Sequence, residues 1–152
     1  MKILALNCGS SSVKYQLFNW ETKEVMAKGV VERIGIGESF IYHKVPATNG
    51  NFREDYECDN HETAIQLIVK KLSIGETAVI SSMDEISAVG HRVVHGGEKF
   101  NHSVRATDEI IKAIEEVSHL APLHNPANLV GIKAAQTALP SAPHIIIFDT
   151  AF

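Results

Sequence analysis

Three polar side chains stand at or near the ends of apolar runs, where a site for an anion would need them. Asn7 follows one such run, Arg92 lies in a second, and Asp149 follows a third. The Arg92 guanidinium stays charged and holds a carboxylate or phosphate through two parallel hydrogen bonds. An ionised Asp149 suits the oxygen shell of Mg²⁺, and Asn7 suits a water bound to that metal. These residue types predict a site for an anion and magnesium.

Each of these residues also has an ordinary structural role open to it. Arg92 can pair with a buried carboxylate that only stabilises the fold. Asp149 can cap a helix or close a turn, and Asn7 can close a hairpin. The alternatives stay open as long as the three side chains are considered one at a time.

A short polar loop follows Asn7 and Cys8. Gly9 can adopt backbone angles closed to other residues, and Ser10, Ser11 and Ser12 offer several amides and hydroxyls within a small space. Residues 9–12, which we call the serine loop, are therefore either a phosphate cradle or a plain polar hairpin turn.

The histidines near these motifs allow more than one interpretation. His124 precedes a predicted helix start, where anions are favoured, so it either donates to a bound anion or is a satisfied buried histidine. His91 and His95 are four residues apart, but they lie on or just after a strand. The helical spacing argument for zinc therefore does not apply to them.

The composition is that of a soluble globular domain. The 152 residues are 45% apolar and 21% charged, with no apolar run near the ~20 residues of a membrane span and no signal-peptide layout. Cys8 and Cys58 form no metal spacing or disulfide framework, so we expect reduced thiols and a cytoplasmic protein. The net charge of -4, without a basic run, argues against nucleic-acid binding.

The front half of the chain predicts a meander followed by a helix. Residues 3–6, 13–17 and 25–31 are spaced as three antiparallel strands, residues 40–45 as another strand, and residues 46–55 as an exposed excursion. A capping box at Asp59 and Glu62 then opens a helix with one apolar face. The later predicted elements are a parallel strand at 86–94, helices from Thr107 and from Asn125 to about Leu139, and a strand at 144–149.

This order is typical of a ribonuclease H-like (actin-like ATPase) α/β fold. We expect a mixed sheet with strand order 3-2-1-4-5 and helices on both faces. The first, fourth and fifth strands then lie parallel, and their carboxyl ends bring Asn7, Arg92 and Asp149 together. Because the chain ends three residues beyond a buried strand, we expect it to be the front part of a larger protein.

Four segments resemble stretches of the acetate kinases: residues 3–14, 88–97, 120–126 and 147–152. The resemblance spans the whole chain but only the N-terminal part of that family's protein, which has two actin-like lobes. It implies reversible phosphorylation of acetate by ATP with Mg²⁺, giving acetyl phosphate and ADP. It also implies a homodimer for the full-length protein, with no nucleic-acid or membrane partner.

The resemblance implies a role for each site residue. Arg92 is assigned to the substrate carboxylate or the transferring phosphoryl group, Lys14 to the ATP phosphates beside the serine loop, and Asn7 to magnesium. Asp149 is assigned as the catalytic carboxylate, which positions magnesium rather than abstracting a proton. The remaining implied substrate contacts are His124, Val94 and Leu123.

Three other functions remain open from the sequence. A propionate kinase has nearly the same motifs, although Val94 leaves less room than alanine and so favours acetate. A ribonuclease H-type nuclease shares the fold but needs more metal carboxylates than this chain offers. The chain is also consistent with a non-catalytic interaction module, because residues supplied by the family's second lobe lie beyond Phe152.

Overall fold

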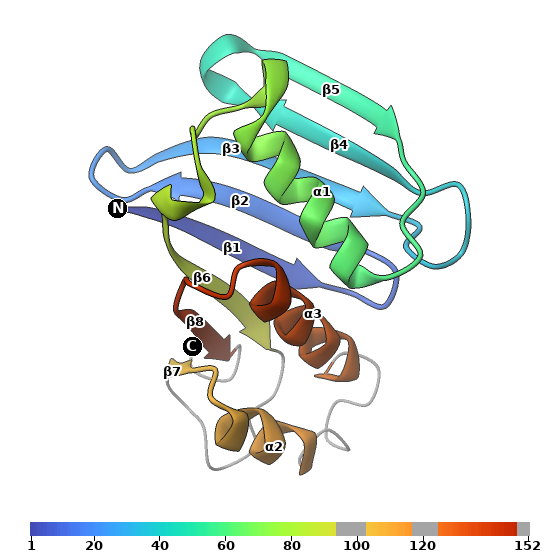
Figure 1. The fold of residues 1–152 in the computed structure, drawn as a ribbon, viewed down its shortest axis with the longest axis vertical. Coiled ribbons are helices and arrows are strands. Elements are labelled where there is room, and N and C mark those ends of the chain that lie inside the picture. The colour runs from blue at the N-terminus through green and yellow to red at the C-terminus, as the bar shows by residue number, and fades with distance from the viewer. Residues whose placement is uncertain (94–102, 117–124, 149–152) are drawn as a thin grey trace.

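The computed structural model describes residues 1–93, 103–116 and 125–148, which form one eight-stranded sheet packed against helices (Figure 1). The strands are β1 (Lys2–Cys8), β2 (Val13–Asn19), β3 (Glu24–Glu32), β4 (Phe40–Val45), β5 (Gly50–Asp55), β6 (Ile86–Val93), β7 (Val104–Arg105) and β8 (His144–Phe148). The α-helices within these ranges are α1 (His61–Ser73), α2 (Asp108–Glu116) and α3 (Asn125–Ala138).

The predicted fold class is confirmed. The sheet order is β5-β4-β3-β2-β1-β6-β8-β7, so the predicted 3-2-1-4-5 order is its centre, β3-β2-β1-β6-β8. Strands β1, β6 and β8 are parallel neighbours, with Leu6 opposite His91 and Val93 opposite Phe148. The carboxyl ends of these three strands therefore meet at one edge, as the site requires.

The sheet is wider than predicted at both edges. The expected excursion at 46–55 is instead a short helical turn, with Asn49 in the left-handed region at φ 55°, followed by β5, which pairs antiparallel with β4. Most β5 side chains are exposed because the strand lies at the edge, and their polar composition therefore resembled that of a loop. The two-residue β7 adds the opposite edge.

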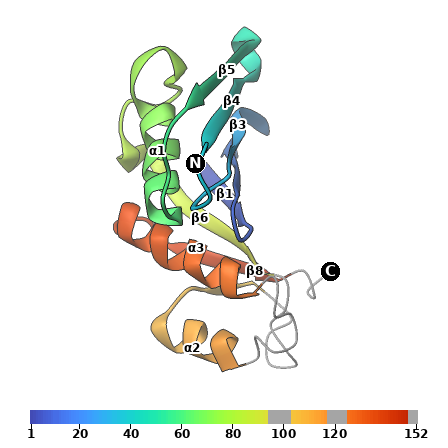
Figure 2. The ribbon, with the colours of Figure 1, turned by 90° about the vertical axis from the view of Figure 1, so that its right-hand side faces the viewer.

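The expectation of helices on both faces is not met within the described residues. Figure 2 shows α1 and α3 on the same side of the sheet. Leu4 and Leu6 of β1 are buried on that side, as are Val13 and Leu17 of β2. The side chains that alternate with them form a second face, which no described helix covers. We call this second side the open face.

Helix α1 begins one residue later than predicted. Its N-cap is Asn60, whose side chain accepts a hydrogen bond from the Thr63 amide at 2.9 Å, rather than Asp59. The start of α2 agrees with the prediction, because the Thr107 hydroxyl accepts a hydrogen bond from the Ile110 amide. In both cases a short polar side chain satisfies an amide that the first turn leaves without a partner.

Helix α3 lies unusually close to β1. A Cβ atom added at Gly131 would overlap the side chain of Cys8, so a larger residue there would push the helix off the strand. The Asn128 side chain reinforces this docking, because its Nδ2 donates to the Cys8 carbonyl at 2.8 Å. The start of α3 is thus fixed to the end of β1, next to the serine loop.

Candidate anion-binding site

The loop from Gly9 to Ser12 is held by hydrogen bonds to its carbonyl groups. The Gly9 amide donates to the Ser12 carbonyl at 2.9 Å and closes the turn. His61 Nε2 donates to the Gly9 carbonyl at 2.7 Å, and the Ile34 amide donates to the Ser11 carbonyl at 2.9 Å. Elements far apart in the sequence therefore fix the loop in one conformation.

These contacts leave the loop's donors available. Within the described part of the chain, the amides of Ser10, Ser11 and Ser12 have no hydrogen-bond acceptor. Successive amides of this kind form a concave site for an anion. The loop therefore has donors available for an anion, as a phosphate cradle requires, and the cradle stays a prediction.

Three predicted site residues line one groove on the open face. Asn7 and Lys14 stand directly opposite each other on β1 and β2, and Arg92 lies on the neighbouring strand β6. The groove has a volume of about 590 Å³ and includes all three side chains in its lining. The structure thus brings together residues that are 85 positions apart in the sequence, from Asn7 to Arg92.

The groove also includes residues that the sequence interpretation did not select. Lys28 on β3 and Lys44 on β4 face each other directly across the two strands. Ala5 and Gly90 also line the groove, and because their side chains are small they leave space in its floor. Side chains alternate between the two faces along β3 and β4, so the sequence carried a signal for where these lysines point. That signal could not be interpreted before the open face of the sheet was known.

The three lysines of the groove have no acidic partner within the part of the chain that the structure describes. Among the described residues, Lys14, Lys28 and Lys44 form no ion pair, and like charges opposite each other destabilise a sheet. A bound anion would relieve this repulsion, and the Arg92 guanidinium adds a further positive charge to the same lining. The groove is therefore suited to a ligand with several negative charges.

Four predicted site residues lie outside the described residues: Val94, Leu123, His124 and Asp149. The described residues next to them in the sequence are Val93, Phe148 and Asn125. Val93 and Phe148 are fully buried and paired across β6 and β8, and Asn125 begins α3.

The described residues fit magnesium in part. Asn7 brings an amide oxygen into the groove, and oxygen is the ligand type that Mg²⁺ prefers. No group of three or more His, Cys, Asp or Glu side chains within the described ranges could hold a metal ion. A magnesium ion here would therefore be bound by few protein atoms and mainly by water and phosphate oxygens.

A pair of buried histidines lies behind the groove, beneath α3. His91 Nε2 and His144 Nδ1 are 2.9 Å apart, and both side chains are buried. Burial, followed by the nearby His144, lowers the pKa of His91 to about 3, and burial also lowers the pKa of His144. Both imidazoles are therefore neutral at pH 7.

These histidines predict that residues 1–152 lose stability in mild acid. Burial likewise lowers the pKa of His43, so the unfolded chain binds protons that the folded chain does not. The stabilisation contributed by these neutral histidines is complete above the unfolded pKa near 6.5 and is lost as the pH falls toward the folded pKa. For His91, whose folded pKa is about 3, this loss approaches about 1.4 kcal/mol per pH unit. Urea unfolding between pH 7 and 5 should show this slope, and His91→Gln should reduce it. Equal stability at both pH values would contradict the assignment.

The sheet order and the groove together define a class of protein. The chain forms a lobe of the actin-like ATPase fold, with a cationic groove and a loop of available amides beside the ends of its parallel strands. Comparison with known proteins narrows this class. The family model of the acetokinase family matches residues 2–152.

Individual relatives agree with the family model. An acetate kinase from Geobacter metallireducens is 61% identical over 152 residues, and one from Thermotoga petrophila is 52% identical. Both matches cover the whole of this chain, but only 36% and 37% of the relatives. The chain belongs to the acetokinase family and spans a little over a third of the length of these relatives.

Solved structures give the same result. The crystal structure of Porphyromonas gingivalis acetate kinase superposes with a TM-score of 0.95 at 45% identity, covering 99% of this chain and 38% of that one. A propionate kinase from Francisella tularensis subsp. tularensis superposes with a TM-score of 0.87 at 34% identity, covering 99% and 37%. None of the described helices has the length and apolar character needed to cross a membrane.

Proposed function

We propose that residues 1–152 are the N-terminal lobe of an acetate kinase, which transfers a phosphoryl group reversibly between ATP and acetate. The observation that carries the proposal is that Asn7, Lys14 and Arg92 line one groove, next to the amides of the serine loop, in a chain of the acetokinase family. The second lobe and the rest of the cleft belong to the remainder of the full-length enzyme.

The chemistry of this reaction explains why the groove is cationic. Acetate is already ionised at neutral pH, so its attack on a phosphoryl group needs no strong general base. It does need positive charge, because an anion must approach a polyanion in line. Lys14 and the serine-loop amides would hold ATP phosphates, and Arg92 would neutralise the transferring group or the substrate carboxylate.

The magnesium-associated residues of this lobe are proposed to be Asn7 and Asp149. Magnesium, when bound, supplies charge neutralisation on the phosphate oxygens. Asn7 orients that part of the site from the end of β1. Asp149 acts as the catalytic carboxylate by positioning, and it does not accept a proton from the substrate. His124 is proposed as a supporting contact to the anion.

We assign acetate as the preferred acid, with propionate as the alternative because a propionate kinase shares the fold. Val94 and Leu123 are proposed to form the wall around the substrate methyl group. In the full-length enzyme, kcat/KM should be higher for acetate than for propionate. Val94→Ala should shift this ratio toward propionate by about tenfold, the effect of one methylene in an apolar pocket.

Parallel assays of the two acids with ATP and Mg²⁺ provide the measurement. Leu17→Ala is a matched control, because Leu17 is buried on the helix-covered side of the sheet and should leave the ratio unchanged. A higher kcat/KM for propionate in the unmodified enzyme would overturn the acetate assignment but keep the carboxylate kinase. No phosphorylation of either acid would overturn the proposed function.

The remaining partners follow from the same proposal. ATP and ADP, with acetate and acetyl phosphate, are the small-molecule partners, and the full-length enzyme is proposed to be a cytoplasmic homodimer. Cys8 and Cys58 are free and buried, which suits a reducing compartment.

A further inference from the structure

We propose that His91 is a positioning residue for Arg92, its neighbour on β6. His91 acts through a chain of hydrogen bonds, from His91 to His144 and from His144 to the Leu139 carbonyl, which holds Arg92 in place relative to the end of β8. The inference rests on the proposed function, because it concerns where Arg92 acts. Nothing in that function requires a histidine at this position, and His91 lies on the covered side of the sheet, away from the groove.

The chain of hydrogen bonds has a defined direction. His144 Nε2 lies 2.9 Å from the Leu139 carbonyl, which can only accept, so this nitrogen carries the proton. In the neutral ring, His144 Nδ1 is then an acceptor and receives the hydrogen bond from His91 Nε2 at 2.9 Å. The two rings are nearly parallel, with centroids 5.2 Å apart. Three elements are thereby connected: β6, β8 and the end of α3.

This polar chain lies between two separate apolar clusters. Val89, two residues before His91 on the same side of β6, belongs to the larger cluster with Ala135 and Leu139. Val93, two residues after it, belongs to the smaller cluster with Ile132, Ile146 and Phe148. Apolar packing alone is not directional, whereas hydrogen bonds fix distance and orientation. Backbone pairing sets the register of β6 with β8, and the histidine pair adds side-chain hydrogen bonds that hold these strands and the end of α3 in one arrangement.

The placement of β6 along β8 controls the catalytic groups. Arg92 follows His91 directly and lies opposite Ile147, and Val93 lies opposite Phe148. Asp149, the proposed catalytic carboxylate, is the next residue of the chain after Phe148. A shift between the two strands would change the position of the guanidinium relative to the reacting atoms. A misplacement of about 1 Å is enough to cost 10²-fold in rate.

The test compares His91→Leu with His91→Gln in the full-length enzyme. Leucine removes the donor, and we expect kcat to fall at least tenfold while the KM for acetate changes less than threefold. Glutamine keeps an N–H at a similar reach, and we expect kcat within threefold of the unmodified enzyme. A loss in kcat alone is the sign of an interaction that matters in the transition state.

A second variant keeps the test decisive if His91→Leu folds poorly. His91→Leu combined with His144→Leu removes both polar partners, so neither imidazole is left unpaired. It should fold and show the same loss in kcat. Val89→Ala is the matched control, because Val89 is fully buried on the same side of β6 and should lower stability without lowering kcat.

The outcomes separate the inference from the proposed function. If His91→Leu and the double variant keep kcat within threefold while only melting temperature falls, His91 is structural and the inference is wrong. If His91→Gln loses as much kcat as His91→Leu, the loss of the N–H donor does not explain the lower kcat, and the inference is also wrong. Failure of the unmodified full-length enzyme to phosphorylate either acid would instead contradict the proposed function itself.

Discussion

Replacing Arg92 with alanine in the full-length enzyme is expected to lower the turnover of acetyl phosphate formation by about 10³-fold. Arg92 contributes a permanent charge to a groove whose proposed substrates are both anions. Its side chain is exposed on the open face, so the fold should tolerate the change. Initial rates with saturating ATP and acetate measure the effect, and the far-UV spectrum should stay unchanged.

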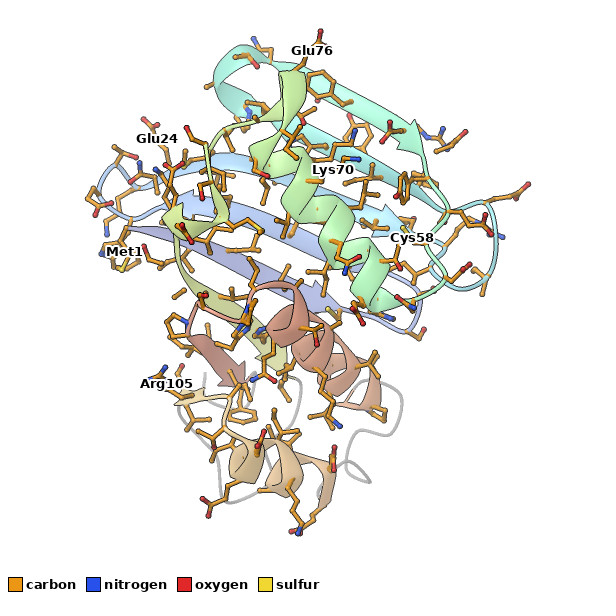
Figure 3. All side chains as sticks on the ribbon, in the orientation of Figure 1. Met1, Glu24, Cys58, Lys70, Glu76 and Arg105 are labelled. Atoms are coloured by element: carbon orange, nitrogen blue, oxygen red, sulfur yellow. The ribbon has the colours of Figure 1, made fainter. Side chains whose placement is uncertain are left out.

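Two further variants define what the arginine supplies. Arg92→Lys keeps the charge but loses the paired hydrogen bonds, so its activity should lie between those of the alanine variant and the unmodified enzyme. Arg105→Ala removes an exposed arginine of β7, labelled in Figure 3, and should leave the rate unchanged. Nearly normal turnover in Arg92→Ala would exclude the proposed role of Arg92.

Residues 1–152 alone are expected to form no measurable acetyl phosphate. The described groove supplies cations from one sheet only, and the chain spans 36% of the Geobacter metallireducens relative. Phosphoryl transfer needs charge stabilisation around the whole phosphoryl group in a site that excludes water. An open groove on the face of a sheet cannot meet the second requirement.

The assay compares equal molar amounts of the purified chain and the full-length enzyme, with ATP, Mg²⁺ and acetate. Gel filtration followed by assay of each fraction guards against a trace of a contaminating kinase. Acetyl phosphate formation that elutes with the 152-residue chain and disappears in its Arg92→Ala variant would refute the prediction. It would show that this lobe holds a complete catalytic site.

The sequence predicted the centre of the fold well because local and global signals agree there. The alternation in β2, where Lys14 and Gln16 separate buried residues, identifies both its strand character and its two faces. The prediction from the sequence failed at β5, where an edge strand exposes most of its side chains and so has the composition of a loop. It also failed for the second face of the sheet, because the sequence of a strand does not say which element covers it.

The site was predictable to the extent that it lies at strand ends. Asn7 and Arg92 could be brought together from topology alone, because parallel strands end at the same edge. Lys28 and Lys44 could not be selected, since exposed lysines are common and only the pairing of β3 with β4 makes them neighbours. The bonds from His61 and Asn128 to the serine-loop region were equally hidden, because they join residues 52 and 120 positions apart.

The close contact between Gly131 and Cys8 makes the thiol of Cys8 a reporter of helix undocking. Burial raises the pKa of Cys8 to about 12, and the side chain is only 4% exposed. A thiol reagent needs an accessible thiolate, so it can reach this sulfur only after α3 moves away from β1. In a chain that lacks Cys58, the labelling rate of Cys8 therefore measures how often the helix opens beside the serine loop.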